Sequence, residues 1–80
     1  MAANLNQNKR IVGIKQVKRA LNSDKVQTVY IAKDAEQRVT SPVEILCKEK
    51  QIDIVYIDTM KELGEICNID VNAAVAALLK

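Results

Sequence analysis

Apolar and polar positions along the chain predict strands and helices in turn. Lys9–Val12 can form a short strand that ends at Gly13. Ile14–Asn22 has its apolar residues at helical spacing, so we expect a helix there. Val26–Ala32 is mainly β-branched and apolar, which is typical of a central strand. Residues 33–40 are polar and are expected to form a loop.

A helix start is predicted after this loop, at Ser41-Pro42-Val43-Glu44. Ser41 has the properties of an N-cap, and Pro42 suits the first helical position because it lacks an N–H group. Glu44 stands where a capping-box partner belongs. We expect this helix to run to about Lys50.

The last third of the chain repeats the alternation. Ile52–Ile57 is expected to be a strand, and Thr59–Glu62 has a second capping-box pattern that begins a helix ending near Asn68. Ala73–Leu79 is open to two interpretations: its alanines favour a helix, but a wholly apolar run also suits a buried strand. The strand–helix–strand order over residues 26–57 implies a parallel crossover. These elements predict an α/β fold with helices on both faces of a small mixed sheet.

Composition limits what such a domain can do. The chain has 80 residues, of which 49% are hydrophobic and 28% charged, as in one small globular domain. We expect residues 1–8 to be a flexible tail and residues 9–80 to be a single domain. The chain has no His, which excludes His-based acid–base catalysis, His metal ligation and Ser/His/Asp triads. Two isolated glycines exclude phosphate-binding loops. We therefore expect no catalytic residues, no metal site and no cofactor.

The two cysteines, Cys47 and Cys67, lie on apolar helix faces. Two thiols are too few for a disulfide-dependent secreted domain or, without His, for a zinc site. We expect both to fill the core in reduced form; a cysteine-based redox enzyme would need a thiol of lowered pKa. The first ten residues lack the apolar stretch of a signal peptide, and no segment is long enough to span a membrane. A cytoplasmic protein is expected.

Charge is distributed unevenly along the chain. Residues 1–33 contain seven Lys and Arg against one Asp, whereas residues 34–80 contain five Lys and Arg against nine Asp and Glu. Such asymmetry favours a basic face for a polyanion. The alternative is that folding mixes the two halves and cancels the patch.

One segment, Gly13–Ala20, combines helical position with binding chemistry. At about 100° per residue, Lys15, Gln16 and Arg19 fall on the face opposite the apolar stripe. Free N–H groups at a helix start attract anions, Gln can address base edges, and cations can contact phosphates. An ordinary solvated helix has the same pattern, so spacing alone leaves both interpretations open.

Four motifs, in their order and spacing, resemble those of a known protein family. The motifs are GIKQVKRAL at Gly13–Leu21, VYIAKDA at Val29–Ala35, LCKEKQIDIVYI at Leu46–Ile57 and LGEICNIDVNAAVAALL at Leu63–Leu79. Together they resemble the archaeal-type L7Ae family of ribosomal proteins, which bind RNA kink-turns, and most of all its short bacterial homologues. The resemblance implies a three-layer α/β/α sandwich around a four-stranded mixed sheet, in which Ala73–Leu79 contains the last strand.

The resemblance also implies a binding site at the strand–helix turn. Archaeal members have Gly-Thr-Asn-Glu there and a Lys one turn later, which hold the tandem sheared G·A pairs of the kink-turn. The matching residues here are Gly13, Ile14, Lys15, Gln16 and Arg19. A carboxylate can accept two hydrogen bonds from a guanine edge, whereas a Gln amide offers one acceptor and one donor site. Lys15-Gln16 therefore departs from the archaeal Asn-Glu pair, and the bacterial relatives resemble this chain in having Lys-Gln at these positions.

A second element implied by the resemblance is the loop Asn68–Asn72. In relatives it packs apolar side chains against unstacked bases, and Ile69 and Val71 match those positions; burial under the short last helix is the competing explanation. Lys33 and Lys61 are plausible phosphate contacts on the same side. The candidate RNA-binding residues are therefore Gly13, Ile14, Lys15, Gln16, Arg19, Lys33, Lys61, Ile69, Asp70 and Val71.

We therefore interpret the chain as a non-enzymatic, ribosomal-protein-like domain that recognises kink-turn RNA. The RNA could be ribosomal or of the riboswitch type. The main alternative is a small protein-interaction module whose basic face docks an acidic partner without RNA specificity. A monomer with no membrane partner is expected, since no uncovered apolar stripe remains once the core is assigned.

Overall fold

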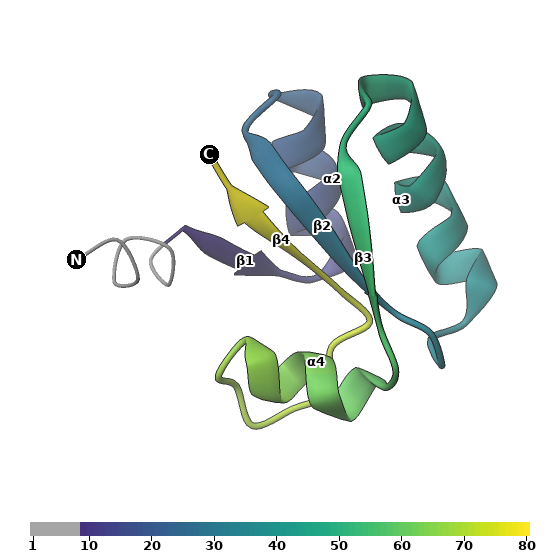
Figure 1. Ribbon diagram of the computed structural model, residues 1–80, viewed down its shortest axis with the longest axis vertical. Coiled ribbons are helices and arrows are strands. Elements are labelled where there is room, and N and C mark those ends of the chain that lie inside the picture. Colours follow the sequence, from purple (N-terminus) through teal and green to yellow (C-terminus); the bar gives the residue numbers. More distant parts are fainter. Residues whose placement is uncertain (1–8) are drawn as a thin grey trace.

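A four-stranded sheet with helices on both faces organises the chain, as the computed structural model shows for residues 9–80 (Figure 1). In chain order the elements are β1 (Arg10–Val12), α2 (Ile14–Asn22), β2 (Val26–Ala32), α3 (Gln37–Lys50), β3 (Asp53–Ile57), α4 (Met60–Ile66) and β4 (Val75–Leu79). The expected flexible tail, residues 1–8, lies outside the described residues. Within residues 9–80, none of the helices has the length and apolar character needed to cross a membrane.

The sheet order is β1-β4-β2-β3. β2 and β3 are parallel, as the strand–helix–strand order predicted, and β4 is antiparallel to both of its neighbours. β4 resolves the ambiguity of Ala73–Leu79 in favour of a strand. Its side chains Ala76 and Ala77 are fully buried on opposite faces of the sheet, and that burial overrides the helix preference of alanine.

Two separate apolar clusters confirm the three-layer α/β/α sandwich. The larger cluster lies between the sheet and the helices α2 and α3, with Val29, Ile31 and Val75 at its centre. The smaller one lies on the opposite face under α4 and is built around Leu63 and Ala32. Figure 1 shows α2 and α3 side by side behind the sheet and α4 across its lower end. α4 therefore covers only part of its face.

Helix α3 begins five residues earlier than predicted. The N-cap is Glu36, whose carbonyl accepts from the N–H groups of Val39 (2.9 Å) and Thr40 (3.2 Å). The predictions of Ser41 as N-cap and of a loop to residue 40 are therefore wrong. The physical reason is that Thr40 is buried and falls on the same helical face as the core residues Val43 and Cys47.

The capping-box interpretation of Pro42 and Glu44 is wrong for the same reason. Pro42 is the sixth residue of α3, exposed to solvent, where its missing N–H leaves one helical hydrogen bond unmade. The Glu44 carboxylate instead accepts a hydrogen bond from the Tyr56 hydroxyl. At α4 the prediction from the same motif is confirmed, since Thr59 Oγ1 accepts a hydrogen bond from the Glu62 N–H at 3.0 Å.

Some large apolar side chains remain exposed in the folded chain. They are Ile45, Val55, Tyr56, Ile66 and Val71. Val55 and Tyr56 belong to the edge strand β3. The monomeric state stays a prediction.

Replacement of Pro42 by Ala tests where α3 begins. Inside a helix Ala restores a backbone hydrogen bond, so Pro42→Ala is expected to raise the free energy of unfolding by about 1–2 kcal/mol. Ser41→Ala is the matched control: it is expected to have little effect in mid-helix but to cost about 1 kcal/mol at an N-cap. Urea unfolding of both variants measures this. A loss of stability in both would contradict a helix that starts at Gln37.

Candidate functional site

Gly13 turns the chain from β1 into α2. Its backbone has φ 109° and ψ 148°, a region that essentially only glycine occupies. The Gly13 N–H donates to the Val75 carbonyl at 3.0 Å, and its own carbonyl accepts from the Val17 N–H at 3.0 Å. Gly13 thus ties the start of α2 to the start of β4.

The first turn of α2 has neither a side-chain cap nor an acidic residue. The N–H groups of Ile14, Lys15 and Gln16 therefore lack the capping acceptor that most helices provide, and they stand at the positive end of the helix dipole. Such an end is suited to an anionic group.

The side chains of α2 divide as the sequence predicted. The buried residues are Val17, Ala20 and Leu21. Lys15, Gln16 and Arg19 are exposed, and Ile14 is half-buried against the core. The outer face of α2 therefore presents one amide between two cations.

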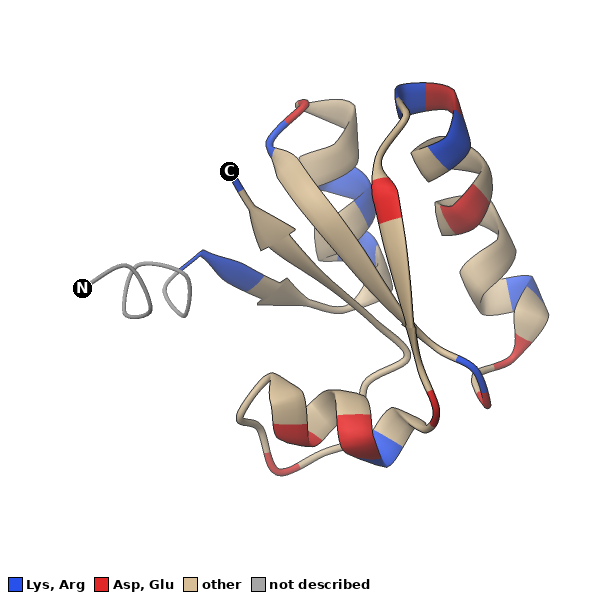
Figure 2. Cartoon of the chain, viewed as in Figure 1, with Lys and Arg blue, Asp and Glu red and all other residues tan. Residues whose placement is uncertain are grey.

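The cations of α2 are not neutralised by the fold. Residues 9–80 contain three ion pairs: Lys33–Asp58 at 3.3 Å, Arg38–Glu36 at 3.1 Å and Lys50–Asp24 at 3.0 Å. Within this part of the chain no carboxylate pairs with Lys15, Lys18 or Arg19. Figure 2 shows basic positions on α2 and acidic positions on α4 and in the turn that follows it. The uneven distribution of charge along the sequence thus leads to an uneven distribution in space, although Lys33 is paired with Asp58.

The loop between α4 and β4 carries the second group of candidates. Val71 is 68% exposed, and Asp70 is also exposed. Ile69 is half-buried and packs on the smaller apolar cluster. The competing explanation of burial therefore applies to one side of Ile69, whereas Val71 is exposed, and contact of the loop with bases stays a prediction.

Gly64 allows this loop to lie against α4. A Cβ at Gly64 would stand 2.2 Å from the Val71 carbonyl oxygen, a contact that no side chain can make. The loop is further held by backbone hydrogen bonds from Ile69 N–H to the Gly64 carbonyl (3.0 Å) and from Ala73 N–H to the Met60 carbonyl (3.1 Å). The position of Val71 therefore depends on the absence of a side chain seven residues earlier.

Hydrogen bonds at one end of the sheet bring the two groups together. Gly13 bonds to Val75 at the start of β4, while the Ala32 N–H at the end of β2 donates to the Ala74 carbonyl at 3.0 Å. The N-terminus of α2 therefore lies beside the start of β4, at the same end of the sheet as the loop that leads into β4. Lys61, in the first turn of α4, lines a hollow with Ile69, Asp70, Val71 and their neighbours Glu65 and Asn72.

Sequence analysis missed three residues that position the loop and α4. Gly64 is one of them. Asp34 is another, since its carboxylate accepts from the Met60 N–H at 2.8 Å. The third is Arg10, whose Nη1 donates to the Ile66 carbonyl at the end of α4. Asp34 and Arg10 lie 26 and 56 residues from their partners in the sequence, so no local pattern could have indicated these two contacts.

The two cysteines are buried and free, as expected. Burial, with a smaller contribution from the Glu44 charge, raises the pKa of Cys47 from 9.0 to about 11. Burial also raises the pKa of Cys67, although Arg10 opposes this shift. Raised pKa values are the opposite of what a nucleophilic thiol needs. Among residues 9–80 there is no group of three metal-ligating side chains of the His, Cys, Asp or Glu type.

Comparison with known proteins gives concordant results. Residues 1–80 match the family described as "Ribosomal protein L7Ae/L30e/S12e/Gadd45 family". An RNA-binding protein of Caldanaerobacter subterraneus subsp. tengcongensis is 59% identical over 69 residues, covering 86% of this chain and 84% of the relative. An RNA-binding protein of Halalkalibacterium halodurans is 51% identical over 70 residues, covering 88% and 85%.

A solved structure agrees with the fold. The Giardia lamblia 15.5kD RNA binding protein superposes with a TM-score of 0.85 at 27% identity over 91% of this chain. The present chain spans 62% of that longer protein.

The raised pKa of Cys47 predicts a stability change at high pH. Since the folded-state pKa lies above the unfolded value, the contribution of Cys47 is present below pH 9 and is lost as pH rises toward 11. The stability difference between wild type and Cys47→Ala is therefore expected to shrink over this range in denaturant titrations. A thiol that reacts with a thiol reagent at neutral pH as fast as an exposed cysteine would contradict this prediction.

The close contact at Gly64 predicts a localised defect in Gly64→Ala. The added methyl group must displace the Val71 backbone, which is expected to cost about 1–3 kcal/mol of stability. Amide NMR shifts should change mainly over residues 68–73. Glu49→Ala, an exposed change in α3, is the control and should leave those shifts in place. Unchanged loop shifts in Gly64→Ala would contradict the contact.

Proposed function

Given that this chain belongs to the L7Ae/L30e/S12e/Gadd45 family of ribosomal proteins, we propose that it binds RNA and recognises kink-turns. The observation that carries the proposal is the meeting of two surfaces at one sheet end. One is the uncapped, cation-flanked start of α2, and the other is the loop with the exposed Val71. Relatives with 59% and 51% identity are named RNA-binding proteins, which supports RNA as the partner.

The start of α2 is proposed to hold the tandem G·A pairs. The N–H groups of the first turn and the Lys15 ammonium supply donors and positive charge, and Gln16 supplies one acceptor and one donor to a base edge. Arg19, one turn further along the exposed face, contacts a phosphate or a guanine acceptor. Because Gln16 is neutral, the site does not repel neighbouring phosphates as a carboxylate would.

The loop is proposed to act on unstacked bases. Val71 offers an apolar surface to a base face, and the exposed flank of Ile69 extends it. Lys61 lies beside this loop and is placed to contact a phosphate. In this proposal a bent RNA contacts both surfaces at once and a straight duplex contacts only one. The protein therefore selects the bent RNA, by as much as its affinity for the two forms differs.

The decisive test compares two labelled RNAs at one stated salt concentration. One is a kink-turn with intact G·A pairs, and the other has Watson–Crick pairs at those positions. We expect much tighter binding of the first. Equal weak binding would indicate only phosphate attraction and would favour the alternative of docking to an acidic protein. Salt dependence alone does not separate these functions, since both predict it.

Single variants then test the two surfaces. Arg19→Ala is expected to weaken kink-turn binding about tenfold or more, because a charged contact worth about 1–3 kcal/mol is lost. Val71→Ala and Ile69→Ala should weaken it less. Lys48→Ala, an exposed cation in the last turn of α3, is the matched control. Wild-type affinity in correctly folded Arg19→Ala would show that the assigned surface is wrong.

A further inference from the structure

One row of side chains on the α4 face of the sheet has no helix over it. The strand register places four residues side by side across β1, β4, β2 and β3: Arg10, Leu78, Thr28 and Asp53. None of them belongs to either apolar cluster. The neighbouring row, which α4 covers in part, contains Val12, Ala76, Tyr30 and Val55. Residues two positions apart in a strand share a face, so both rows lie on the α4 face. We call the first of them the open row.

Apolar surface is exposed along the open row. Leu78 is half-buried, Val55 at the β3 edge is 41% exposed, and Ile66 at the end of α4 is 48% exposed. A hollow between the sheet and α4 is lined by Arg10, Tyr30, Ile66, Cys67 and Leu78. The sheet is the floor of this hollow and the flank of α4 is one wall. An apolar element laid over the open row would therefore contact both.

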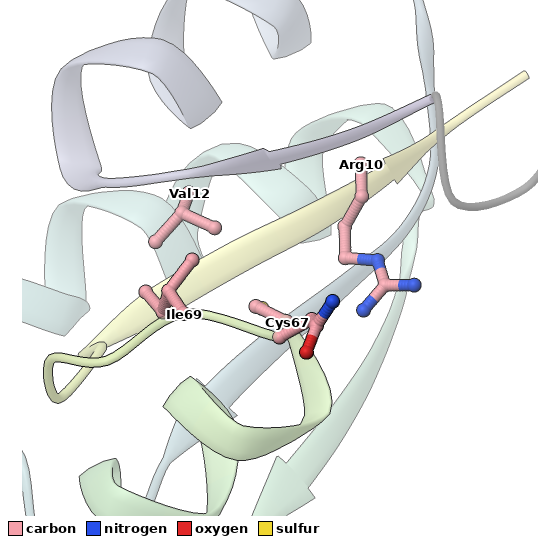
Figure 3. A pocket seen from close by; sticks show the side chains of 5 residues that line it. Arg10, Val12, Cys67 and Ile69 are labelled. Atoms are coloured by element: carbon pink, nitrogen blue, oxygen red, sulfur yellow. The ribbon is translucent and has the colours of Figure 1, made fainter.

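The ends of α4 show which polar groups hold a helix across this face. α4 runs from the β3 edge of the sheet to the β1 edge. At its start, the Asp34 carboxylate accepts a hydrogen bond from the Met60 N–H at 2.8 Å. At its end, Arg10 Nη1 donates to the Ile66 carbonyl, and Figure 3 shows the Arg10 side chain extending from β1 toward the segment at Cys67. An anion at the start of a helix and a cation at its end both complement the helix dipole.

The open row has the same arrangement of charges without a helix. Asp53 lies at the β3 edge and Arg10 at the β1 edge, and Figure 2 shows the acidic start of β3 and the basic start of β1. Within residues 9–80 neither of the two forms an ion pair. Arg10 has further donors besides the one used at Ile66, because a guanidinium has five N–H groups. A helix over the open row would therefore start at Asp53 and end at Arg10, parallel to α4.

The dimensions of the sheet fit such a helix. From β1 to β3 four strands span about 14 Å at about 4.8 Å per step, which about ten helical residues cover at 1.5 Å each. α4 packs on the row of Tyr30 and on Ala32 and Ile57 beyond it. Rows on one face are about 7 Å apart. A helix centred on the open row would thus lie about 10 Å from α4, within the usual range for packed helices.

The described part of the chain offers no helix for this position. Its three helices bury their apolar stripes in their own core, and each exposes at most one large apolar side chain: Ile45 in α3 and Ile66 in α4. A second copy therefore has no free apolar helix face to contribute. Residues 1–8 contain no charged side chain that could pair with Arg10 or Asp53. These observations favour a helix of another protein.

We propose that the open row is the docking site of an amphipathic helix of a partner protein, about ten residues long and parallel to α4. Its apolar stripe contacts Leu78, Val55 and Ile66. A basic residue in its first turn pairs with Asp53, and an acidic residue in its last turn pairs with Arg10. The proposal does not rest on RNA binding, since this site and α2 lie on opposite faces of the sheet. One molecule can therefore hold RNA and the partner together.

The experiment titrates the full chain with three helix-locked peptides of about twelve residues. All three have the same stripe of Leu and Ile. The first has Lys in its first turn and Glu in its last turn, the second has Glu in both turns, and the third has Lys first and Gln last. The proteins are the wild type, Asp53→Lys and, as the matched control, Glu49→Lys, which makes the same charge change at an exposed residue of α3. Amide NMR shifts report affinity and site.

The wild type is expected to bind the Lys-first, Glu-last peptide about threefold or more tightly than either of the others, because each of those loses one charge contact. Asp53→Lys should reverse the preference and favour the peptide with Glu in both turns. Glu49→Lys should keep the wild-type preference. The shifts should concentrate at residues 28–30, 53–55, 66–67 and 78.

Other results would overturn the proposal. They are the same order of peptide affinities in the wild type and in Asp53→Lys, shifts confined to α2 and α3, or no binding at about 1 mM peptide. Nuclear Overhauser contacts from residues 1–8 to Tyr30 or Val55 would assign the open row to the chain itself, and concentration-dependent shifts there without peptide would assign it to a second copy. Kink-turn affinity should change less than twofold when the peptide is bound. A failure of G·A discrimination would therefore concern the proposed function alone.

Discussion

The hydrogen bonding at the start of β4 is the constraint on which the candidate site depends. Residues 74 and 75 accept one hydrogen bond from Ala32 at the end of β2 and another from Gly13 at the end of β1. These two bonds fix the strand that separates the basic helix from the apolar loop. Because β4 is buried on both faces by small side chains, its register cannot slip without moving apolar groups out of the core. The two surfaces thus keep one relative position.

The distribution of charged residues leaves α2 positively charged at this end of the molecule. The acid nearest to that helix in the sequence, Asp24, is paired with Lys50, which holds the pKa of the Asp24 carboxyl below its usual value. The acidic positions of α4 belong to a helix on the opposite face of the sheet from α2. The unpaired cations of α2 therefore make that helix the attractive side of the molecule for a polyanion.

Local patterns predicted the elements whose own residues determine them. α2 and β2 have the predicted bounds because their apolar spacing is complete within the segment. The start of α3 was missed because Ser41-Pro42 imitates an N-cap, whereas the buried Thr40 extends the helix backward. The exposed face of α2 followed from helical spacing, but the support for the loop did not. Gly64 lies against a carbonyl seven residues away in the sequence, and Arg10 donates to one that is 56 residues away. Only the folded chain shows these two contacts.

The two halves of the site differ in how they are held. α2 packs two fully buried side chains, Val17 and Leu21, into the larger cluster. α4 has seven residues and buries only Leu63 and Gly64, so apolar packing contributes less to its position. Polar contacts compensate: two come from distant segments, Asp34 at its first residue and Arg10 at its last carbonyl, and one comes from its own N-cap, Thr59. α4 and its loop are therefore the part of the site with the lowest local stability. RNA held at the loop, as proposed, is expected to stabilise α4 as well, which would couple the affinity for RNA to these three contacts although none of them belongs to the α2 surface.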